Sequence, residues 1–117
     1  MNNFQFRFWD KNLKKMCFRK PSHNDFTNPK IVPMMFIGAI GANSVEVWQD
    51  DVCEVQMHHQ GKPIGDLFKA GIKYNEHIGA FQIKYKCMGG GFATDNIGFK
   101  YFLKVIGNVY EHPELLN

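Results

Sequence analysis

Two-residue alternation of apolar and polar side chains is the feature that most constrains how this chain folds. It recurs in several short runs, of which GAFQIKYKC (79–87) is the clearest. Successive side chains of a β-strand point to opposite faces, so these runs predict strands with one buried face. We therefore expect a mostly β protein with little helix. It would be a small antiparallel barrel, SH3-like or similar, with an N-terminal β-hairpin arm.

The expected strands are separated by glycine, proline and asparagine. They lie at 4–9, 16–19, 34–39, 45–48, 53–57, 79–87 and 99–110. Residues 58–77 contain glycine and proline at short spacing, and we expect an irregular excursion there. Residues 88–98 (MGGGFATDNIG) are expected to form a flexible connection, and residues 21–29 (PSHNDFTNP) a loop.

Two further features indicate how strands begin and end. Asp50 and Asp51 interrupt a strand-like run and indicate a bend or bulge. Pro113 lacks an N–H group, so the last strand ends before it, and PELL (113–116) suits one helical turn. Leu115 and Leu116 would then fold back as a lid over the end of the core.

The 117 residues fit one domain. We divide it into a basic N-terminal hairpin and linker (1–30) and a β-barrel body with a C-terminal closing turn (31–117). No window approaches the roughly 20 apolar residues that cross a bilayer, and the first residues lack the apolar stretch of a signal peptide. We therefore expect a cytoplasmic protein.

Positive charge is concentrated at the N-terminus. Residues 1–30 hold seven Lys and Arg against two acids, whereas residues 31–117 hold seven against nine. This asymmetry indicates an anionic partner, or an acidic surface on a neighbouring subunit, for the N-terminal quarter.

Residues with catalytic or metal-binding chemistry do not form a recognisable motif. Cys53, His58 and His59 are close in sequence, but zinc sites need four ligands at regular spacing, and the two histidines of a strand would point to opposite faces. Cys17 and Cys87 lie far from Cys53 in the sequence. We interpret the three cysteines as buried free thiols, which is simpler than a disulfide framework or a catalytic nucleophile. We expect no catalytic residues, no metal and no cofactor.

Three segments together resemble the YopX family of phage and prophage proteins. They are FRFWDKNLKKM (6–16), MFIGAIGANSVEVWQDDVCEV (35–55) and VIGNVYEHPELL (105–116). Within the second segment, Asp50 stands where a glycine is usual in the family. A glycine would adopt a positive φ at this position without steric cost. The resemblance implies a phage-encoded, largely β homo-oligomer in the host cytoplasm, and it carries over no catalytic residues.

Two functional hypotheses remain. In the first, the protein is a non-enzymatic accessory protein that assembles with itself or binds a host or phage protein. In the alternative, it is a small barrel that binds nucleic acid on a basic, aromatic hairpin, as barrels bind single strands by stacking and charge. The candidate binding residues are Arg7, Trp9, Lys11, Lys14, Lys15, Arg19, Lys100 and Lys104. Lys84 and Lys86 adjoin Tyr85 in the sequence and carry the same combination of charge and aromatic ring.

Overall fold

The structure is a computed structural model that describes residues 5–98 and 101–116. Within these residues the strands are β1 (Phe6–Asp10), β2 (Lys15–Phe18), β3 (Ile31–Ile40), β4 (Glu46–Trp48), β5 (Asp51–His59), β6 (Lys62–Asn75), β7 (Ala80–Lys86), β8 (Phe92–Asn96) and β9 (Tyr101–Asn108). A short helix α1 (His23–Thr27) and a 3₁₀ turn η1 (Pro113–Leu116) complete the described elements. The mostly β fold with little helix is confirmed.

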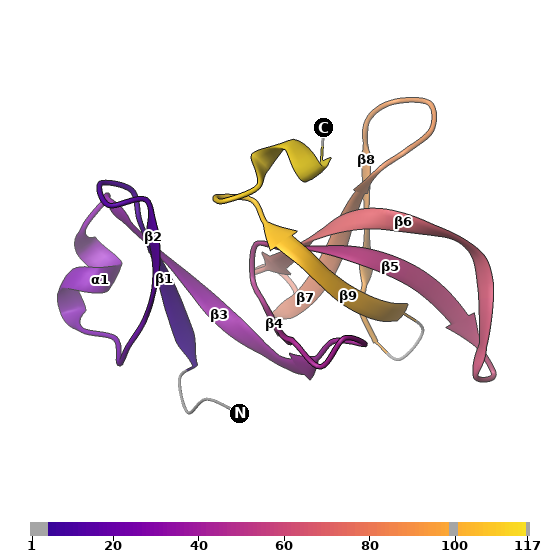
Figure 1. Ribbon diagram of the computed structural model, residues 1–117, viewed down its shortest axis with the longest axis horizontal. Coiled ribbons are helices and arrows are strands. Elements are labelled where there is room, and N and C mark those ends of the chain that lie inside the picture. The colour runs from indigo at the N-terminus through magenta and orange to yellow at the C-terminus, as the bar shows by residue number, and fades with distance from the viewer. Residues whose placement is uncertain (1–4, 99–100, 117) are drawn as a thin grey trace.

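The strands form two antiparallel sheets. The first has the order β2-β1-β3-β4 and the second β8-β7-β6-β5-β9. The five-stranded sheet curls into a half-barrel. Strand β3 runs from the N-terminal sheet toward the half-barrel and connects the two parts (Figure 1). It pairs with β1 over Ile31–Met35 and with β4 over its second half, so pairing crosses the boundary that we placed at residue 30.

The expected irregular excursion at 58–77 is wrong, because most of it is β6. Strands β5 and β6 form a hairpin whose loop, Gln60 and Gly61, has φ of 52° and 77°. Two positive φ values match the twist of paired strands, which explains how these residues turn the chain tightly. Gly65, with φ of 72°, lies in an irregular stretch where the register shifts, so it bends the strand without ending it.

The expected flexible connection at 88–98 is also wrong. It contains β8, which pairs with β7 from Gln82↔Asn96 to Lys86↔Phe92. Gly90 and Gly91 have positive φ and form the turn between the two strands. The glycine run therefore makes a hairpin turn, and the ladder on both sides of it fixes its position.

The expected loop at 21–29 contains α1. The N–H of Ser22 donates a 2.8 Å hydrogen bond to Asp25 Oδ2, which holds the first turn of the helix. Phe26 of α1 packs against the rings of Phe6 and Phe8, with centroids 5.4 and 6.2 Å apart. Among the residues that the structure describes, no helix is long and apolar enough to cross a membrane.

The main core lies inside the half-barrel. Its fully buried members come from β4, β5, β6 and β7 and are Val47, Cys53, Val55, Ala70, Ile72 and Ile83. Tyr101 and Leu103 of β9 complete the cluster. Alternation within the expected strands at 53–57, 79–87 and 99–110 places Cys53 and Val55, Ile83, and Tyr101 and Leu103 on inward faces, and these are confirmed. It also places Met57 with Cys53 and Val55, but Met57 is 38% exposed because it lies where the hairpin extends beyond the core.

The C-terminal turn packs against the outer face of the half-barrel. Register places Gly71, Val52 and Gly107 side by side on β6, β5 and β9. A Cβ atom at Gly71 would lie 3.2 Å from Leu116 Cδ1, and one at Gly107 would lie 2.7 Å from Leu115 Cδ1. The two leucines thus cover fully buried Val52 from outside. The helical turn is confirmed, but its position over the outer face corrects the expected lid over the end of the core.

Candidate functional site at the junction of the two sheets

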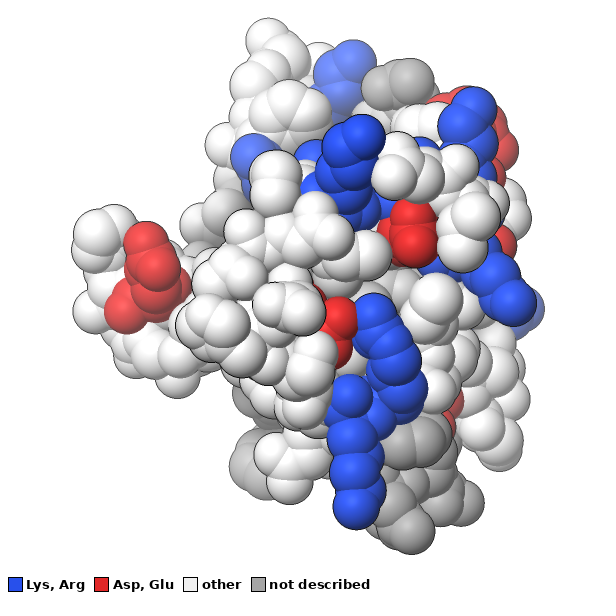
Figure 2. Space-filling model, turned by 90° about the vertical axis from the view of Figure 1, so that its left-hand side faces the viewer, with Lys and Arg blue, Asp and Glu red and all other residues white. Residues whose placement is uncertain are grey.

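Most of the basic residues singled out from the sequence lie at the surface. Lys11, Lys14, Lys15, Arg19 and Lys104 are exposed. The other predicted lysine, residue 100, lies outside the described residues. Figure 2 looks onto the side of the molecule that carries the N-terminal sheet, and Lys and Arg are spread over it with fewer acidic groups among them.

Arg7 and Trp9, in contrast, are buried and not available to an external partner. Their exposed fractions are 6% and 8%, while Phe8 between them is fully buried. Phe8 packs under α1, with the Arg19 guanidinium 4.7 Å from its ring centroid. Arg7 and Trp9 point the other way, toward the half-barrel. Both faces of β1 are therefore covered, which is the physical reason why alternation alone did not sort them.

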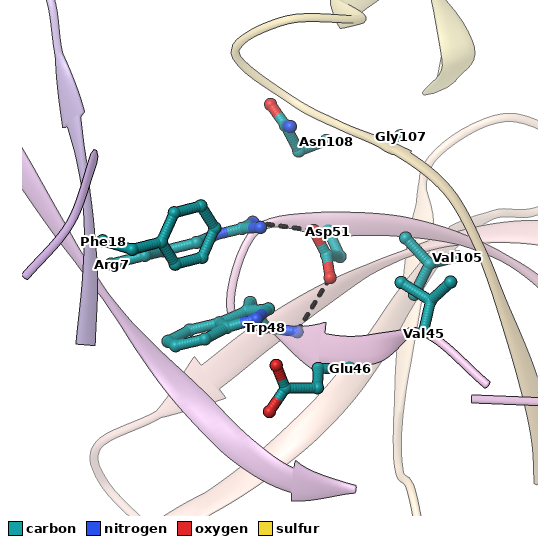
Figure 3. Close-up of a pocket in the computed structure, with 9 residues that line it drawn as sticks. All are labelled: Arg7, Phe18, Val45, Glu46, Trp48, Asp51, Val105, Gly107 and Asn108. Atoms are coloured by element: carbon teal, nitrogen blue, oxygen red, sulfur yellow. Dashed lines mark hydrogen bonds and ion pairs between the residues drawn. The ribbon is translucent and has the colours of Figure 1, made fainter. Parts of the chain in front are cut away.

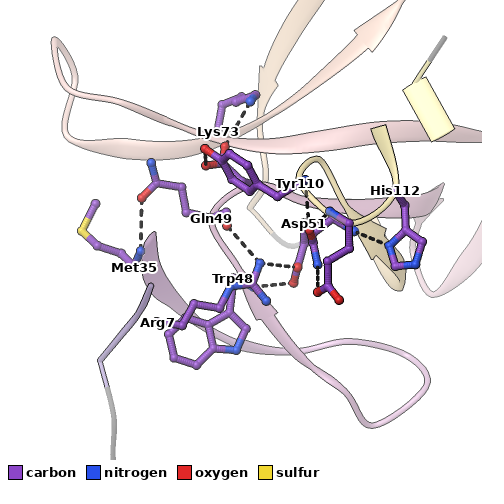
Figure 4. Close-up of polar contacts among 11 residues, drawn as sticks. Arg7, Met35, Trp48, Gln49, Asp51, Lys73, Tyr110 and His112 are labelled. Atoms are coloured by element: carbon purple, nitrogen blue, oxygen red, sulfur yellow. Dashed lines mark hydrogen bonds and ion pairs between the residues drawn. The ribbon is translucent and has the colours of Figure 1, made fainter. Parts of the chain in front are cut away.

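The buried Arg7 guanidinium binds Asp51 at the start of β5. Arg7 Nη2 donates to Asp51 Oδ1 at 2.7 Å and to the carbonyl of Gln49 at 3.3 Å. The other carboxylate oxygen, Oδ2, accepts the N–H of Trp48 at 2.8 Å. Arg7 also lies over the Trp48 ring, 5.5 Å from its centroid. One charge-assisted pair thus joins the first sheet to the second (Figure 4).

The Asp51 carboxyl experiences opposing effects. Burial raises the pKa of Asp51 above its ordinary value, although the Arg7 charge and the Trp48 N–H act in the opposite direction. The net direction shows that loss of solvent is the largest influence on this group. The Arg7 guanidinium therefore favours the charged form of Asp51 against the cost of its burial.

A second set of contacts surrounds Asp50, the residue before β5. Asp50 has φ of 69°, so it occupies the left-handed conformation that the family resemblance implies for this position. Its carboxylate binds Lys73 Nζ at 3.1 Å and accepts the Tyr110 hydroxyl at 3.3 Å. The Tyr110 ring stacks on Trp9 with centroids 5.6 Å apart. Adjacent aspartates thus connect β1 and β6 with the segment between β9 and η1, and the predicted bend is confirmed.

An open pocket of about 270 Å³ lies beside the Arg7–Asp51 pair (Figure 3). It is lined by Arg7, Phe18, Val45, Glu46, Trp48, Asp51, Val105, Gly107 and Asn108. Arg7 Nε is buried and has no hydrogen-bond partner among the described residues. Phe18 and Val45 at the pocket are 49% and 44% exposed. The junction therefore offers a buried N–H donor beside apolar walls, with acidic groups next to it.

The residues considered for metal binding are separated by the sheet. Cys53 faces the core and is fully buried, and burial raises its pKa to about 12. His58 stacks on Phe102, with ring centroids 3.7 Å apart, and His59 is exposed. In the part of the chain that the structure describes, no three His, Cys, Asp or Glu side chains are placed to hold a metal ion.

A protruding apolar surface lies at the far end of the β5–β6 hairpin. Its large side chains are Met57, Ile64 and Leu67, with exposed fractions of 38%, 45% and 55%, and we call them the hairpin surface. Residues 62–67 are all exposed, because β7 pairs with β6 only from Gly71 onward. The hairpin therefore extends beyond the rest of the sheet, as Figure 1 shows.

Sequence reasoning missed the Arg7–Asp51 pair and the hairpin surface. The alternating pattern places Arg7 on an outward face, and nothing local tells an arginine that meets water from one that meets an aspartate 44 residues away. The hairpin surface was missed because its glycine and proline were interpreted as ending a strand. The available signal was weak: a Gly that follows Gln60 can form a two-residue hairpin turn, but His59 and Lys62 flank the pair and interrupt the apolar alternation.

Comparison with known proteins agrees with the fold. The chain matches the family model described as YopX protein over residues 11–117. Among solved structures it is similar to the crystal structure of protein EF1440 from Enterococcus faecalis, with a TM-score of 0.54 and 20% sequence identity. That match covers 97% of each chain, and at this identity it supports the fold alone. No curated protein matches. Since the family model spans nearly the whole sequence, the chain belongs to the YopX protein family.

Proposed function

We propose that this protein is a phage accessory protein that has no enzymatic activity and acts by binding polypeptides in the bacterial host cytoplasm. Its first partner is a second copy of itself, and the homo-oligomer is the form that engages a host or phage protein. The hairpin surface is the single observation that carries this proposal. Phage origin and host localisation rest on the resemblance of the chain to its family.

The hairpin surface has the properties of a contact site. Met57 and Ile64 are register partners and so share one face, and Leu67 is exposed on the same hairpin. Large apolar side chains that stay exposed on one hairpin indicate a surface that a partner covers. Two features limit strand addition at the neighbouring edge, because Pro63 lacks an N–H and Gly65 has positive φ. The partner is therefore expected to pack against the side chains of Ile64 and Leu67 without extending the sheet.

The N-terminal hairpin is a less suitable self-association site than its charge indicates. Its Arg7 already binds Asp51 of the same chain, and Trp9 already stacks on Tyr110. Removing residues 1–30 would also remove β1, which pairs with β3. Point substitutions are thus a cleaner test than deletion of this segment.

Sedimentation velocity of the full chain tests the proposal. We expect the unmodified protein to sediment as a dimer or larger species, and Leu67→Asp to shift it to monomer because a carboxylate would be desolvated at the contact. Leu13→Asp is the matched control, since Leu13 is a leucine that is 70% exposed in the β1–β2 turn. It should sediment like the unmodified protein. A monomer in every sample, over the whole accessible concentration range, contradicts the proposal.

A further inference from the structure

A row of side chains crosses the outer face of the half-barrel. Register aligns Lys104 of β9 with Glu54 of β5, and Glu54 with Lys69 of β6. On the same face, beyond β6 in the strand order, Lys86 of β7 is aligned with Phe92 of β8. Strand partners share a face, so these side chains project on the side opposite the core. We call Lys69, Lys86 and Lys104 the lysine row.

The two halves of the row meet at a pocket. Strands β6 and β7 stop pairing at Gly71↔Lys84, and beyond that point they separate. A pocket of about 250 Å³ opens there, lined by Phe68, Lys69, Lys86, Phe92, Leu115 and Leu116. The pocket therefore places two ammonium groups beside aromatic and aliphatic walls, and no acidic side chain among the described residues lines it.

The charges of the lysine row are not neutralised within the described part of the chain. Lys69, Lys86 and Lys104 are exposed and have no ion-pair partner among the described residues, in contrast to Lys73, which binds Asp50. Glu54 is the one acidic side chain within the aligned row. A run of cations with a single acid attracts an anionic ligand. The cations span the four strands from β9 to β7, and three spacings of about 4.8 Å give the run a length of about 14 Å.

Exposed aromatic rings accompany these cations. Phe92 is 59% exposed, and the Lys84 Nζ atom lies 5.1 Å from its ring centroid. Phe102 is 52% exposed and stacks on His58. It lies two residues before Lys104 on β9 and therefore on the same face of the sheet. Phosphate alone would need only the lysines, whereas flat rings beside a line of cations match a ligand with both phosphates and planar bases.

We propose that the lysine row binds single-stranded nucleic acid. Lys69, Lys86 and Lys104 contact successive phosphates, and one base enters the pocket and stacks on Phe92. This site lies on the half-barrel instead of on the basic N-terminal segment. It shares no residue with the hairpin surface, so it is independent of self-association.

Fluorescence anisotropy with a labelled single-stranded oligothymidine tests the proposal on the full chain. With three phosphate contacts, affinity should fall about 20-fold between 50 and 200 mM salt. The double variant Lys69→Ala/Lys86→Ala should weaken binding about tenfold or more. Phe92→Ala should weaken it about fivefold or more through lost stacking while keeping the salt dependence.

The matched control is Lys11→Ala/Lys15→Ala, which removes the same charge from exposed lysines of the N-terminal hairpin. Its affinity should stay close to that of the unmodified protein, and circular dichroism of each variant should show a native fold. Absence of binding at 50 mM salt overturns the proposal, and so does an equal loss in the control pair. Equally tight binding of polyglutamate would also overturn it, since the site would then select charge without bases.

Discussion

At the scale of single residues, Arg7 and Asp51 balance two opposing energies. Both groups lose water on folding, which costs free energy, and their mutual hydrogen bonds recover it. Their side chains are 7% and 3% exposed, and Trp48 supplies a further N–H to the carboxylate. Such a pair costs little while intact, but removal of one partner leaves an uncompensated buried charge.

We expect Arg7→Met to lower the free energy of unfolding by about 3–5 kcal/mol, because it leaves the buried Asp51 carboxylate without its charged partner. Arg19→Met is the comparison, since Arg19 binds Asp25 at 2.6 Å with its own side chain 43% exposed. Solvent screening limits that pair to about 1 kcal/mol or less. Urea titrations of both variants measure the difference, and equal losses would show that burial of the Arg7 pair has no special weight.

Cys53 should be chemically inert in the folded protein. Burial raises its pKa to about 12, and the thiolate is the reactive form. We expect Ellman's reagent to modify Cys17 and Cys87, which are partly exposed, and to reach Cys53 only after denaturation. Mass spectrometry of the labelled peptides identifies the sites. Rapid modification of Cys53 in the native state would mean that the core opens far more readily than its packing implies.

At the scale of elements, η1 stays in place because the strands beneath it carry glycine. Gly107 and Gly71 flank Val52 across three strands, and neither has positive φ, so their role is to admit the leucine side chains. This explains why a glycine in the middle of β6 does not indicate a weak strand. The 3₁₀ turn and the strands beneath it are thus fitted to one another.

We expect Gly107→Ala to destabilise the protein by about 1–3 kcal/mol, because the added Cβ would lie 2.7 Å from Leu115 Cδ1 and from His112 Nδ1. Thermal unfolding measures this loss, and hydrogen exchange should report faster opening of residues 113–116. Gly89→Ala is the control, since a Cβ added at Gly89 would meet no described heavy atom within 4 Å and its φ is not positive. Similar melting of the two variants would contradict the fitted contact.

At the scale of the whole molecule, two sheets meet end to end and give an elongated shape of 43 × 32 × 28 Å. Buried Val47 of β4 joins the half-barrel core, and the specific polar and aromatic contacts between the two parts include Arg7 with Asp51 and Trp9 with Tyr110. Stability of the assembled chain should therefore respond to the ionisation of groups at and near this junction.

Alkaline pH should destabilise the whole protein. Burial and a neighbouring aspartate raise the pKa of Tyr110 and of Tyr101 to about 12. The unfolded chain loses these protons near its ordinary pKa of about 10, so the stability they contribute is complete below pH 10 and is lost as pH rises toward 12. Urea midpoints measured across this window should fall, and Tyr101→Phe/Tyr110→Phe should flatten the decline. An unchanged slope in that variant would assign the effect to other groups.

Much of the fold could be predicted from short-range pattern. Alternation located Cys53, Val55, Ile83 and Leu103 on one face, because a pleated strand must put every second side chain on the same side. It could not say what covers the other face, and the prediction failed where both faces are covered, as at Arg7. The candidate site was the least predictable part of the protein, because its charged residues are distant from one another in the sequence.

The sequence by itself determined that this chain makes strands, where its C-terminal turn begins and which family it belongs to, because these depend on neighbouring residues. Only the tertiary structure decided that Arg7 is buried against Asp51, that η1 covers the outer sheet face, and that Lys69, Lys86 and Lys104 align in a row. Strand register sets these relations, and register depends on pairing between segments far apart in the chain.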